Sequence, residues 1–170
     1  MSTKTAFQEP QPIGWSRAEV QKFASDAALK LGYKPGDDME AVVEKKLGGR
    51  ISVSDWDSSR DTGAIQVEGP KNFLISLSPL SGHRRSRFTI AHEIGHYMLH
   101  SQMGRIPIRV KRDGSGQVEW EANWFAAGFL MPEKEFKTKR AEGWGDAELA
   151  EHFGVSLAAV TIRKESLAAA

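Results

Sequence analysis

The stretch AHEIGHYMLH, residues 91–100, indicates both the fold and the chemistry of this chain. It contains H-E-x-x-H, in which His92 and His96 stand four positions apart and Glu93 follows the first histidine. Residues four apart lie on one face of a helix, so both imidazoles can reach a single ion. Zinc accepts nitrogen ligands at about 2.0–2.1 Å, and Glu93, rotated away from them, is placed to act on a water molecule. The pattern predicts a Zn²⁺-binding helix over residues 83–100.

A third ligand distinguishes a zinc site from two histidines on a solvated or core helix. The continuation found in metzincins is absent, because Leu99 and Gln102 stand where that pattern needs glycine and histidine. The helix predicted over residues 117–130 supplies two carboxylates instead, Glu119 and Glu121. The ligand set is therefore expected to join two helices.

Glu119 is the preferred third ligand, because Asn123 follows it by four positions on the same helical face. There the Asn123 amide can orient Glu119 or one of the histidines. Glu121 is expected to be solvated or in an ion pair, although the helical-face argument leaves it open as the ligand.

Three further side chains are candidates for roles around the predicted metal. His100 shares the face of His96, so it can support the ligands, and Tyr97 is adjacent. Peptide hydrolysis also needs a group that stabilises the developing oxyanion. Tyr33, Tyr97 and His100 are candidates for that role by residue type alone.

The remaining periodicity predicts an α+β fold of one domain over residues 1–170. A flexible tail (1–13) precedes a core over 14–142 and a helix-turn-helix-like pair of C-terminal helices over 146–167. Alternating apolar residues predict a small, mostly antiparallel sheet of about three strands. The expected strands lie near 51–55, 65–67 and 73–77, with a short further strand at 106–110 inside a mobile loop over 101–118. Helices are expected near 17–31, 39–47, 83–100, 117–130, 132–142, 146–153 and 157–167.

Composition narrows the class of protein. The chain has 170 residues and a net charge of +1, so its overall field gives no reason to expect direct binding of nucleic acid or an anionic membrane. It has no cysteine, which excludes disulfides and thiolate metal ligands. No apolar run has the length of a membrane span, and the start lacks the apolar core of a secretory signal. We expect a cytoplasmic protein, whose oligomeric state the sequence does not indicate.

Two motifs together resemble the ImmA/IrrE family of zinc metallopeptidases. The first is FTIAHEIGHYMLH (88–100) and the second is EWEANWFAAGFLMP (119–132), close to the family pattern E-x-x-A-N-x-F-A-A-x-L-L-M-P. Only Gly128 and Phe129 look atypical. The resemblance implies a zincin-like minimal fold and a gluzincin-like site in which Glu119 is the third metal ligand.

The resemblance also implies a regulatory function. Such peptidases cleave a helix-turn-helix (XRE-type) DNA-binding repressor. Loss of the repressor then induces mobile-element or stress-response genes. Two alternatives remain: a catalytically idle zincin-fold module that binds a repressor or DNA, and a toxin or effector peptidase with a host target. Retention of Glu93 argues against the idle module, because a pure metal scaffold has no use for that carboxylate.

Three other features receive simpler interpretations. The strand at 72–77 precedes the histidine helix and is expected to be an edge strand that pairs with an extended substrate. Arg84, Arg85 and Arg87 are expected to form a solvated basic face, and contact with an acidic segment of the substrate is the alternative. The C-terminal helices have helix-turn-helix spacing but only Arg163 and Lys164 nearby, so packing or substrate docking is preferred over DNA binding.

Overall fold

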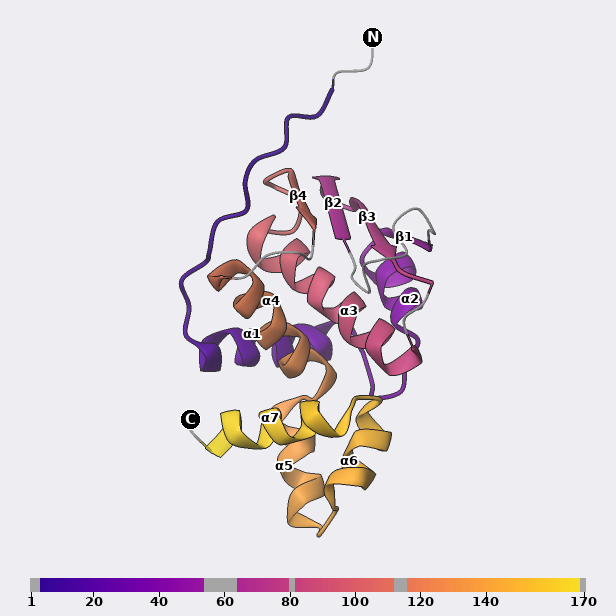
Figure 1. Cartoon of the computed structure of the whole chain (residues 1–170), viewed down its shortest axis with the longest axis vertical. Helices are drawn as coiled ribbons and strands as arrows, with labels where there is room; N and C mark the ends of the chain where they lie inside the picture. The colour runs from indigo at the N-terminus through magenta and orange to yellow at the C-terminus, as the bar shows by residue number, and fades with distance from the viewer. Residues whose placement is uncertain (1–3, 54–63, 80–81, 112–115, 169–170) are drawn as a thin grey trace.

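The chain forms an α+β fold in which a small sheet and two long helices enclose the core. The computed structural model describes residues 4–53, 64–79, 82–111 and 116–168. Helices α3 (His83–Gly95) and α4 (Gln117–Leu130) run through the centre, with the sheet at one end and the short C-terminal helices at the other (Figure 1). The α+β class predicted from the sequence is confirmed.

Helix α1 (Arg17–Lys30) begins where the sequence predicts, because its first turn satisfies its own free backbone groups. The Ser16 hydroxyl accepts a hydrogen bond from Glu19 N at 3.2 Å, and the Glu19 carboxylate accepts one from Ser16 N at 2.8 Å. The helix then packs along α4 at Gly128. A Cβ added there would stand 2.6 Å from the carbonyl oxygen of Gln21, so only glycine permits this approach.

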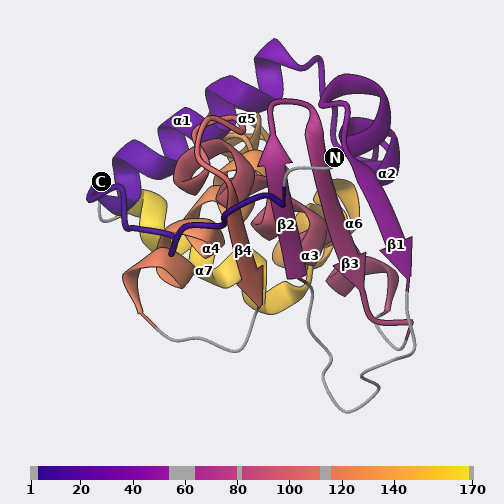
Figure 2. The same cartoon turned by 90° about the horizontal axis from the view of Figure 1, so that it is seen from above.

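The sheet has four strands in the order β1-β3-β2-β4 (Figure 2). The strands are β1 (Arg50–Val53), β2 (Ala64–Gly69), β3 (Asn72–Leu77) and β4 (Ile108–Lys111). Strand β2 pairs antiparallel with both β3 and β4, whereas β1 is parallel to β3. The mostly antiparallel arrangement is as predicted, and the short segment near 106–110 is the fourth strand. The predicted extension of the first strand to Asp55 lies outside the described residues.

The expectation that residues 72–77 form an edge strand is wrong. Ile75 of β3 pairs with Ile51 on one side and with Ile65 on the other, so β3 is an interior strand. Its backbone groups are used on both sides, and an added peptide would have no partners there. The edges of the described sheet are β1 and β4.

The N-terminal segment runs along the outer side of β4. Gln8 N donates a hydrogen bond to Pro107 O at 2.8 Å, and Gln8 forms an isolated parallel bridge with Ile108. The guanidinium of Arg109 lies 4.4 Å from the ring centroid of Phe7. The sequence predicted only a loose tail over 1–13; in the described part, these contacts tether it to the sheet (Figure 2).

The histidine helix changes its geometry at the second predicted ligand. After α3, a π-helical turn, η2 (His96–His100), continues the helix and is closed by a bond from Ser101 N to His96 O at 2.9 Å. Wide turns of this kind occur often at functional sites. Just before this turn, a Cβ on Gly95 would stand 3.0 Å from Phe125 Cβ, which shows how closely α4 approaches.

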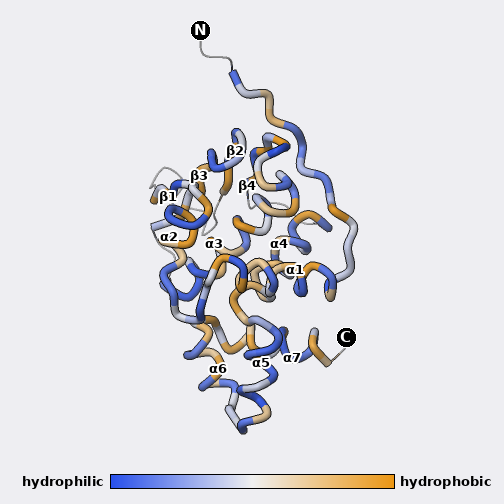
Figure 3. The backbone as a smooth tube through the Cα atoms, turned by 180° about the vertical axis from the view of Figure 1, so that it is seen from behind, coloured by the Kyte–Doolittle hydropathy of each residue, from blue (hydrophilic) through white to orange (hydrophobic). Residues whose placement is uncertain are grey.

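The smaller helices complete the core. They are α2 (Met39–Ala41), the π-turn η1 (Val42–Lys46), α5 (Glu133–Ala141), α6 (Asp146–Phe153) and α7 (Leu157–Ala168). Helix α5 is mostly hydrophilic (Figure 3), and its buried Phe136 packs against buried Phe153 of α6. Within the described ranges, no helix combines the length and apolarity needed to cross a membrane.

The turn between α6 and α7 has the expected helix-turn-helix form, but α7 is fixed by packing. Gly154 ends α6 in the left-handed conformation, with φ of 66°. Arg163 is buried, and it donates hydrogen bonds to Met131 O at 3.0 Å and to Gln21 Oε1 at 2.9 Å. Burial lowers the pKa of Arg163 to about 10. This arginine is therefore a structural tie and is not available to contact DNA.

The basic cluster before the motif is not the uniformly solvated face that the sequence suggested. Arg87 is buried, and it donates hydrogen bonds to Tyr33 Oη and to Asp37 O, each at 2.7 Å. Arg84 donates to Val155 O at 3.1 Å. Arg87 can be buried because a carbonyl and a hydroxyl group from a distant segment accept its hydrogen bonds.

Candidate metal centre

The three predicted ligands, His92, His96 and Glu119, lie close together between α3 and α4. Nε2 of His92 and Nε2 of His96 are 3.2 Å apart. One carboxylate oxygen of Glu119 lies 2.9 Å from the first nitrogen, and the other lies 3.2 Å from the second. Both histidines are fully buried, and Glu119 retains 9% exposure. The structure therefore brings together the three side chains that the sequence nominated.

These distances fit a tetrahedral ion. Ligands held about 2.0–2.1 Å from a tetrahedral centre are about 3.3–3.4 Å from one another, close to the separations found here. Two imidazole nitrogens and a carboxylate repel when all three present lone pairs, unless protons or a cation lie between them. This donor set therefore fits Zn²⁺ in chemistry and in spacing.

Asn123 fixes the orientation of the first histidine. Its Oδ1 lies 2.8 Å from Nδ1 of His92. Since an amide oxygen only accepts, this contact requires the proton of His92 on Nδ1 and leaves the Nε2 lone pair toward Glu119. The sequence offered Glu119 or a histidine as the partner of Asn123, and the structure places it on the histidine.

The second histidine is oriented by a longer chain of hydrogen bonds. Nδ1 of His96 lies 2.9 Å from Nδ1 of His100, and Nε2 of His100 lies 2.9 Å from Oε1 of Glu121. A carboxylate only accepts, so Glu121 accepts a hydrogen bond from Nε2–H of His100. Nδ1 of His100 is then unprotonated and accepts a hydrogen bond from Nδ1–H of His96. This order leaves the Nε2 lone pair of His96 directed toward the other donors. Each histidine is thus held in the tautomer that binds a metal.

Glu121 is part of the site through its contact with His100, although it is not a partner of Nε2 of His92 or of His96. It is buried, and its two oxygens accept hydrogen bonds from Ile13 N and Gly14 N, each at 2.9 Å. The sequence predicted that Glu121 is solvated or in an ion pair; the structure instead buries it in a hydrogen bond with His100, whose pKa is lowered. The N-terminal segment that covers Glu121 lies more than a hundred residues earlier in the chain, and no local pattern predicts that contact.

Burial sets the protonation state of the cluster. It lowers the pKa of His96 to about 4, against the opposing effect of the neighbouring Glu119 carboxylate. Burial also lowers the pKa of His100 despite the neighbouring Glu121. For Glu119, burial acts to raise the pKa, but the close approach of His92 and His96 outweighs it and the pKa is lowered. At neutral pH His96 and His100 are therefore neutral and Glu119 is ionised, and a neutral imidazole and an ionised carboxylate are the forms that bind a metal.

Glu93 lies beside the converging donors and is 1% exposed. One of its oxygens, one nitrogen of His92 and one of His96 all lie within 4.8 Å of one another. Glu119 also lies close to both histidines, with one oxygen 2.9 Å from Nε2 of His92 and the other 3.2 Å from Nε2 of His96. Two carboxylates therefore stand beside the histidine pair, Glu93 from the same helix and Glu119 from α4.

The two tyrosines considered from the sequence are engaged elsewhere. The Tyr97 hydroxyl accepts from Lys71 N at 3.2 Å and donates to Met103 O at 3.3 Å, and its ring stacks on Phe73. The Tyr33 hydroxyl bonds Arg87. Of the three oxyanion candidates, only His100 contacts a predicted ligand.

A histidine pair on one helix, a carboxylate on the next and a mixed sheet are together typical of metallopeptidase-like folds of the zincin type. The sequence matches the IrrE N-terminal-like domain family of peptidases (peptidase M78) over residues 47–164, which is more than half of its length. The chain belongs to this family. The match includes both helices of the site and α5–α7 up to Lys164, whereas α1 and the N-terminal segment precede it.

A Mycobacterium tuberculosis transcriptional regulator of known structure is similar in fold. The TM-score is 0.58 with 18% sequence identity, and the alignment covers 84% of this chain and 45% of that chain. This chain thus corresponds to less than half of the regulator, and at this identity the likeness concerns the fold. A search of curated proteins found no match.

Proposed function

We propose that this protein is a zinc-dependent endopeptidase in which His92, His96 and Glu119 are the protein ligands. The observation that supports this most directly is the convergence of two Nε2 atoms and a carboxylate at 2.9–3.2 Å from one another. Membership of a peptidase family supports the same reading. Zinc bound there would supply Lewis-acid chemistry, polarising a scissile carbonyl and lowering the pKa of a water molecule to about 7.

Glu93 acts as the general base in this proposal. It takes the proton of the attacking water and then donates it to the leaving amine of the cleaved peptide bond. Its burial beside the ligands keeps bulk water from competing for that proton. Asn123, His100 and Glu121 hold the two ligand histidines in their metal-binding tautomers.

The substrate in this proposal is a helix-turn-helix transcriptional repressor, and its cleavage induces the genes that it silences. The family and the fold shared with a transcriptional regulator support a regulatory role. We place the protein in the cytoplasm, where such a repressor acts. Direct DNA binding by the C-terminal helices is not part of the proposal, since Arg163 is buried.

The first test is the metal content of the purified protein and of two matched variants. We expect one zinc per chain in the wild type, zinc that is retained but bound more weakly in Glu121→Ala, and loss of zinc in Glu119→Ala. Folded wild-type protein that binds no divalent metal, even when supplied, would refute the metal site. Loss only in Glu121→Ala would keep the site and replace the third ligand.

The second test is cleavage of purified helix-turn-helix repressors of the XRE type, followed by mass spectrometry of the fragments. Glu93→Gln should retain zinc and lose cleavage by about 10²–10⁴-fold, as expected for a missing general base. Zinc-loaded wild type that binds the repressor without cutting it would favour the idle binding module. Cleavage of host proteins instead would favour an effector.

A further inference from the structure

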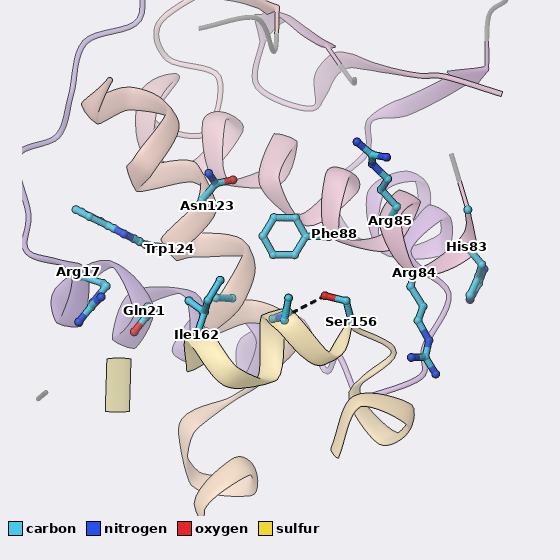
Figure 4. Close-up of a pocket in the computed structure, with 14 residues that line it drawn as sticks. Arg17, Gln21, His83, Arg84, Arg85, Phe88, Asn123, Trp124, Ser156 and Ile162 are labelled. Atoms are coloured by element: carbon cyan, nitrogen blue, oxygen red, sulfur yellow. Dashed lines mark hydrogen bonds between the residues drawn. The ribbon is translucent and has the colours of Figure 1, made fainter. Parts of the chain in front are cut away.

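A groove runs from the metal centre toward the C-terminal helices, and the proposed mechanism does not use it. Residues of α1, α3, α4 and α7 line a groove of about 940 Å³ (Figure 4). Asn123 forms part of its wall and also bonds Nδ1 of His92 at 2.8 Å. The groove therefore begins at a side chain that touches a predicted ligand.

The groove lies along the interface between α3 and α4, which also holds the metal centre. Phe88 stands four residues before His92 on α3, and Ala127 stands four residues after Asn123 on α4. Residues four apart share a helical face, so the groove lies one to two turns farther along the faces that carry the ligands. A polypeptide bound at the metal centre can continue into it.

The floor of the groove is apolar and partly open. Figure 4 shows Phe88 and Ile162 facing one another across the space, with Trp124 on the side formed by α4. Ile162 keeps 56% exposure. The apolar lining residues are Phe88, Trp124, Ala127, Ala158, Ala159 and Ile162. Exposed apolar surface gathered in a groove is a common mark of a binding site, because covering it is favourable.

The rim of the groove is basic. Arg84 and Arg85 lie on the α3 side and Arg17 on the α1 side (Figure 4), with His83 beside the first two. Among the described residues that line it, none is Asp or Glu. The whole chain has a net charge of only +1, so this rim is a local concentration of positive charge. It complements a negatively charged partner.

We infer that this groove is the substrate-recognition site for a protein segment with a bulky apolar residue flanked by Asp or Glu. This inference rests on the proposed peptidase function and names the feature of the substrate that the enzyme selects. The apolar residue fits between Phe88 and Ile162, and the flanking carboxylates meet the arginines of the rim. A polypeptide is favoured over nucleic acid because an apolar floor offers phosphate groups no partner, whereas apolar side chains gain by covering it.

The inference can be tested by binding without turnover. The zinc-loaded Glu93→Gln variant is titrated against three sets of fluorescein-labelled peptides, read by anisotropy. Each peptide has a central Leu or Phe in a mixed sequence, flanked by Glu, Gln or Lys. The Glu-flanked set should bind about tenfold more tightly than the Lys-flanked set at low salt, and the difference should shrink at high salt. Equal affinity across the sets would overturn the inference.

Two groove variants and their controls locate the binding. Ile162→Glu should weaken binding of the Glu-flanked set about tenfold or more, whereas Leu29→Glu, on the exposed side of α1, should not. The double change Arg84→Glu and Arg85→Glu should reverse the preference toward Lys-flanked peptides. Its control is Lys134→Glu with Arg140→Glu on α5. Unchanged binding in Ile162→Glu, or displacement of the peptides by duplex DNA, would overturn the inference.

The same variants separate this inference from the proposed function. If the wild type cleaves a repressor and Ile162→Glu cleaves it with unchanged KM, the peptidase stands and the groove is not its recognition site. If Glu-flanked peptides bind in the groove but zinc-loaded wild type cleaves neither them nor the repressor, the recognition site stands and the peptidase proposal fails.

Discussion

His100 and Glu121 form a hydrogen-bonded pair with no solvent access, in which Nε2 of the histidine lies 2.9 Å from Oε1 of the carboxylate. On its other side, His100 bonds Nδ1 of His96 at 2.9 Å. Glu121 in turn accepts two backbone hydrogen bonds from the N-terminal segment. The orientation of one proposed ligand therefore depends on a segment that the family match does not include.

Replacing Glu121 tests whether this chain of hydrogen bonds tunes the metal. Glu121→Gln keeps the size of the side chain but removes the charge that orders the protons of His100 and His96. We expect zinc affinity to fall about 10–100-fold, as for other residues that support metal-binding histidines. Competition with a chromophoric chelator measures this, and circular dichroism checks that the variant is folded.

The control is Lys137→Gln, which removes an exposed i,i+4 pair with Glu133 on α5 and should leave zinc affinity unchanged. A folded Glu121→Gln variant with wild-type zinc affinity would show that Glu121 only anchors the N-terminal segment.

Asn123 makes the equivalent contact on the other histidine. Asn123→Leu removes the acceptor for Nδ1 of His92, so the imidazole can rotate or change tautomer. We expect zinc affinity to fall about 10–100-fold and Asn123→Asp to retain most of it, because a carboxylate still accepts that proton. Isothermal titration with zinc measures both. Equal loss in the two variants would contradict the hydrogen-bonding role.

The sequence predicted the parts of the site that depend on local spacing. The pairing of His92 with His96 follows from helical periodicity, and the capping box of α1 is a pattern of four residues. Periodicity preferred Glu119 but left Glu121 open, and the resemblance to the family singled out Glu119. Helix boundaries were correspondingly close to those observed. The resemblance of two motifs identified the family that the comparison then confirmed.

What the sequence could not predict depends on contacts between distant segments. The interior place of β3 is set by pairing with β1 and β2, and strand order leaves no local signal. The sequence predicted that Glu121 points away from the ligands, because residues two apart on a helix point to different sides. The side of α4 that carries Glu121 is covered by Ile13 and Gly14, whose backbone groups bond its carboxylate. Arg87 looked solvated because its partner Tyr33 is 54 residues away.

Gly128, in the second motif, should be required for the packing of α1. In Gly128→Ala, the new Cβ would lie 2.6 Å from Gln21 O and 2.8 Å from Gln21 Cα, so the helices must separate. We expect the free energy of unfolding to fall by about 1–3 kcal/mol, the usual range for overpacking. Urea denaturation measures this change.

Gly69→Ala is the matched control for that experiment, because a Cβ there meets nothing within 4 Å. Its stability should lie within about 0.5 kcal/mol of the wild type, as for ordinary surface changes. If Gly128→Ala were as stable as this control, α1 and α4 would have to pack less closely than described.

Zinc itself should stabilise the folded protein, because its donors converge only when α3 and α4 are packed together. A ligand that binds only the folded state stabilises it by about 2.7 kcal/mol at a free concentration of one hundred times its Kd. Thermal unfolding should therefore shift to higher temperature as buffered free zinc rises, and return when a chelator removes it. Glu119→Ala should show little of this shift, since only His92 and His96 remain as donors, whereas Trp120→Ala, at the exposed neighbouring position, should behave like the wild type. A wild-type transition that does not respond to zinc, in protein shown to bind it, would mean that the unfolded chain binds zinc as tightly as the folded protein, and a site formed by the packing of α3 and α4 would be wrong.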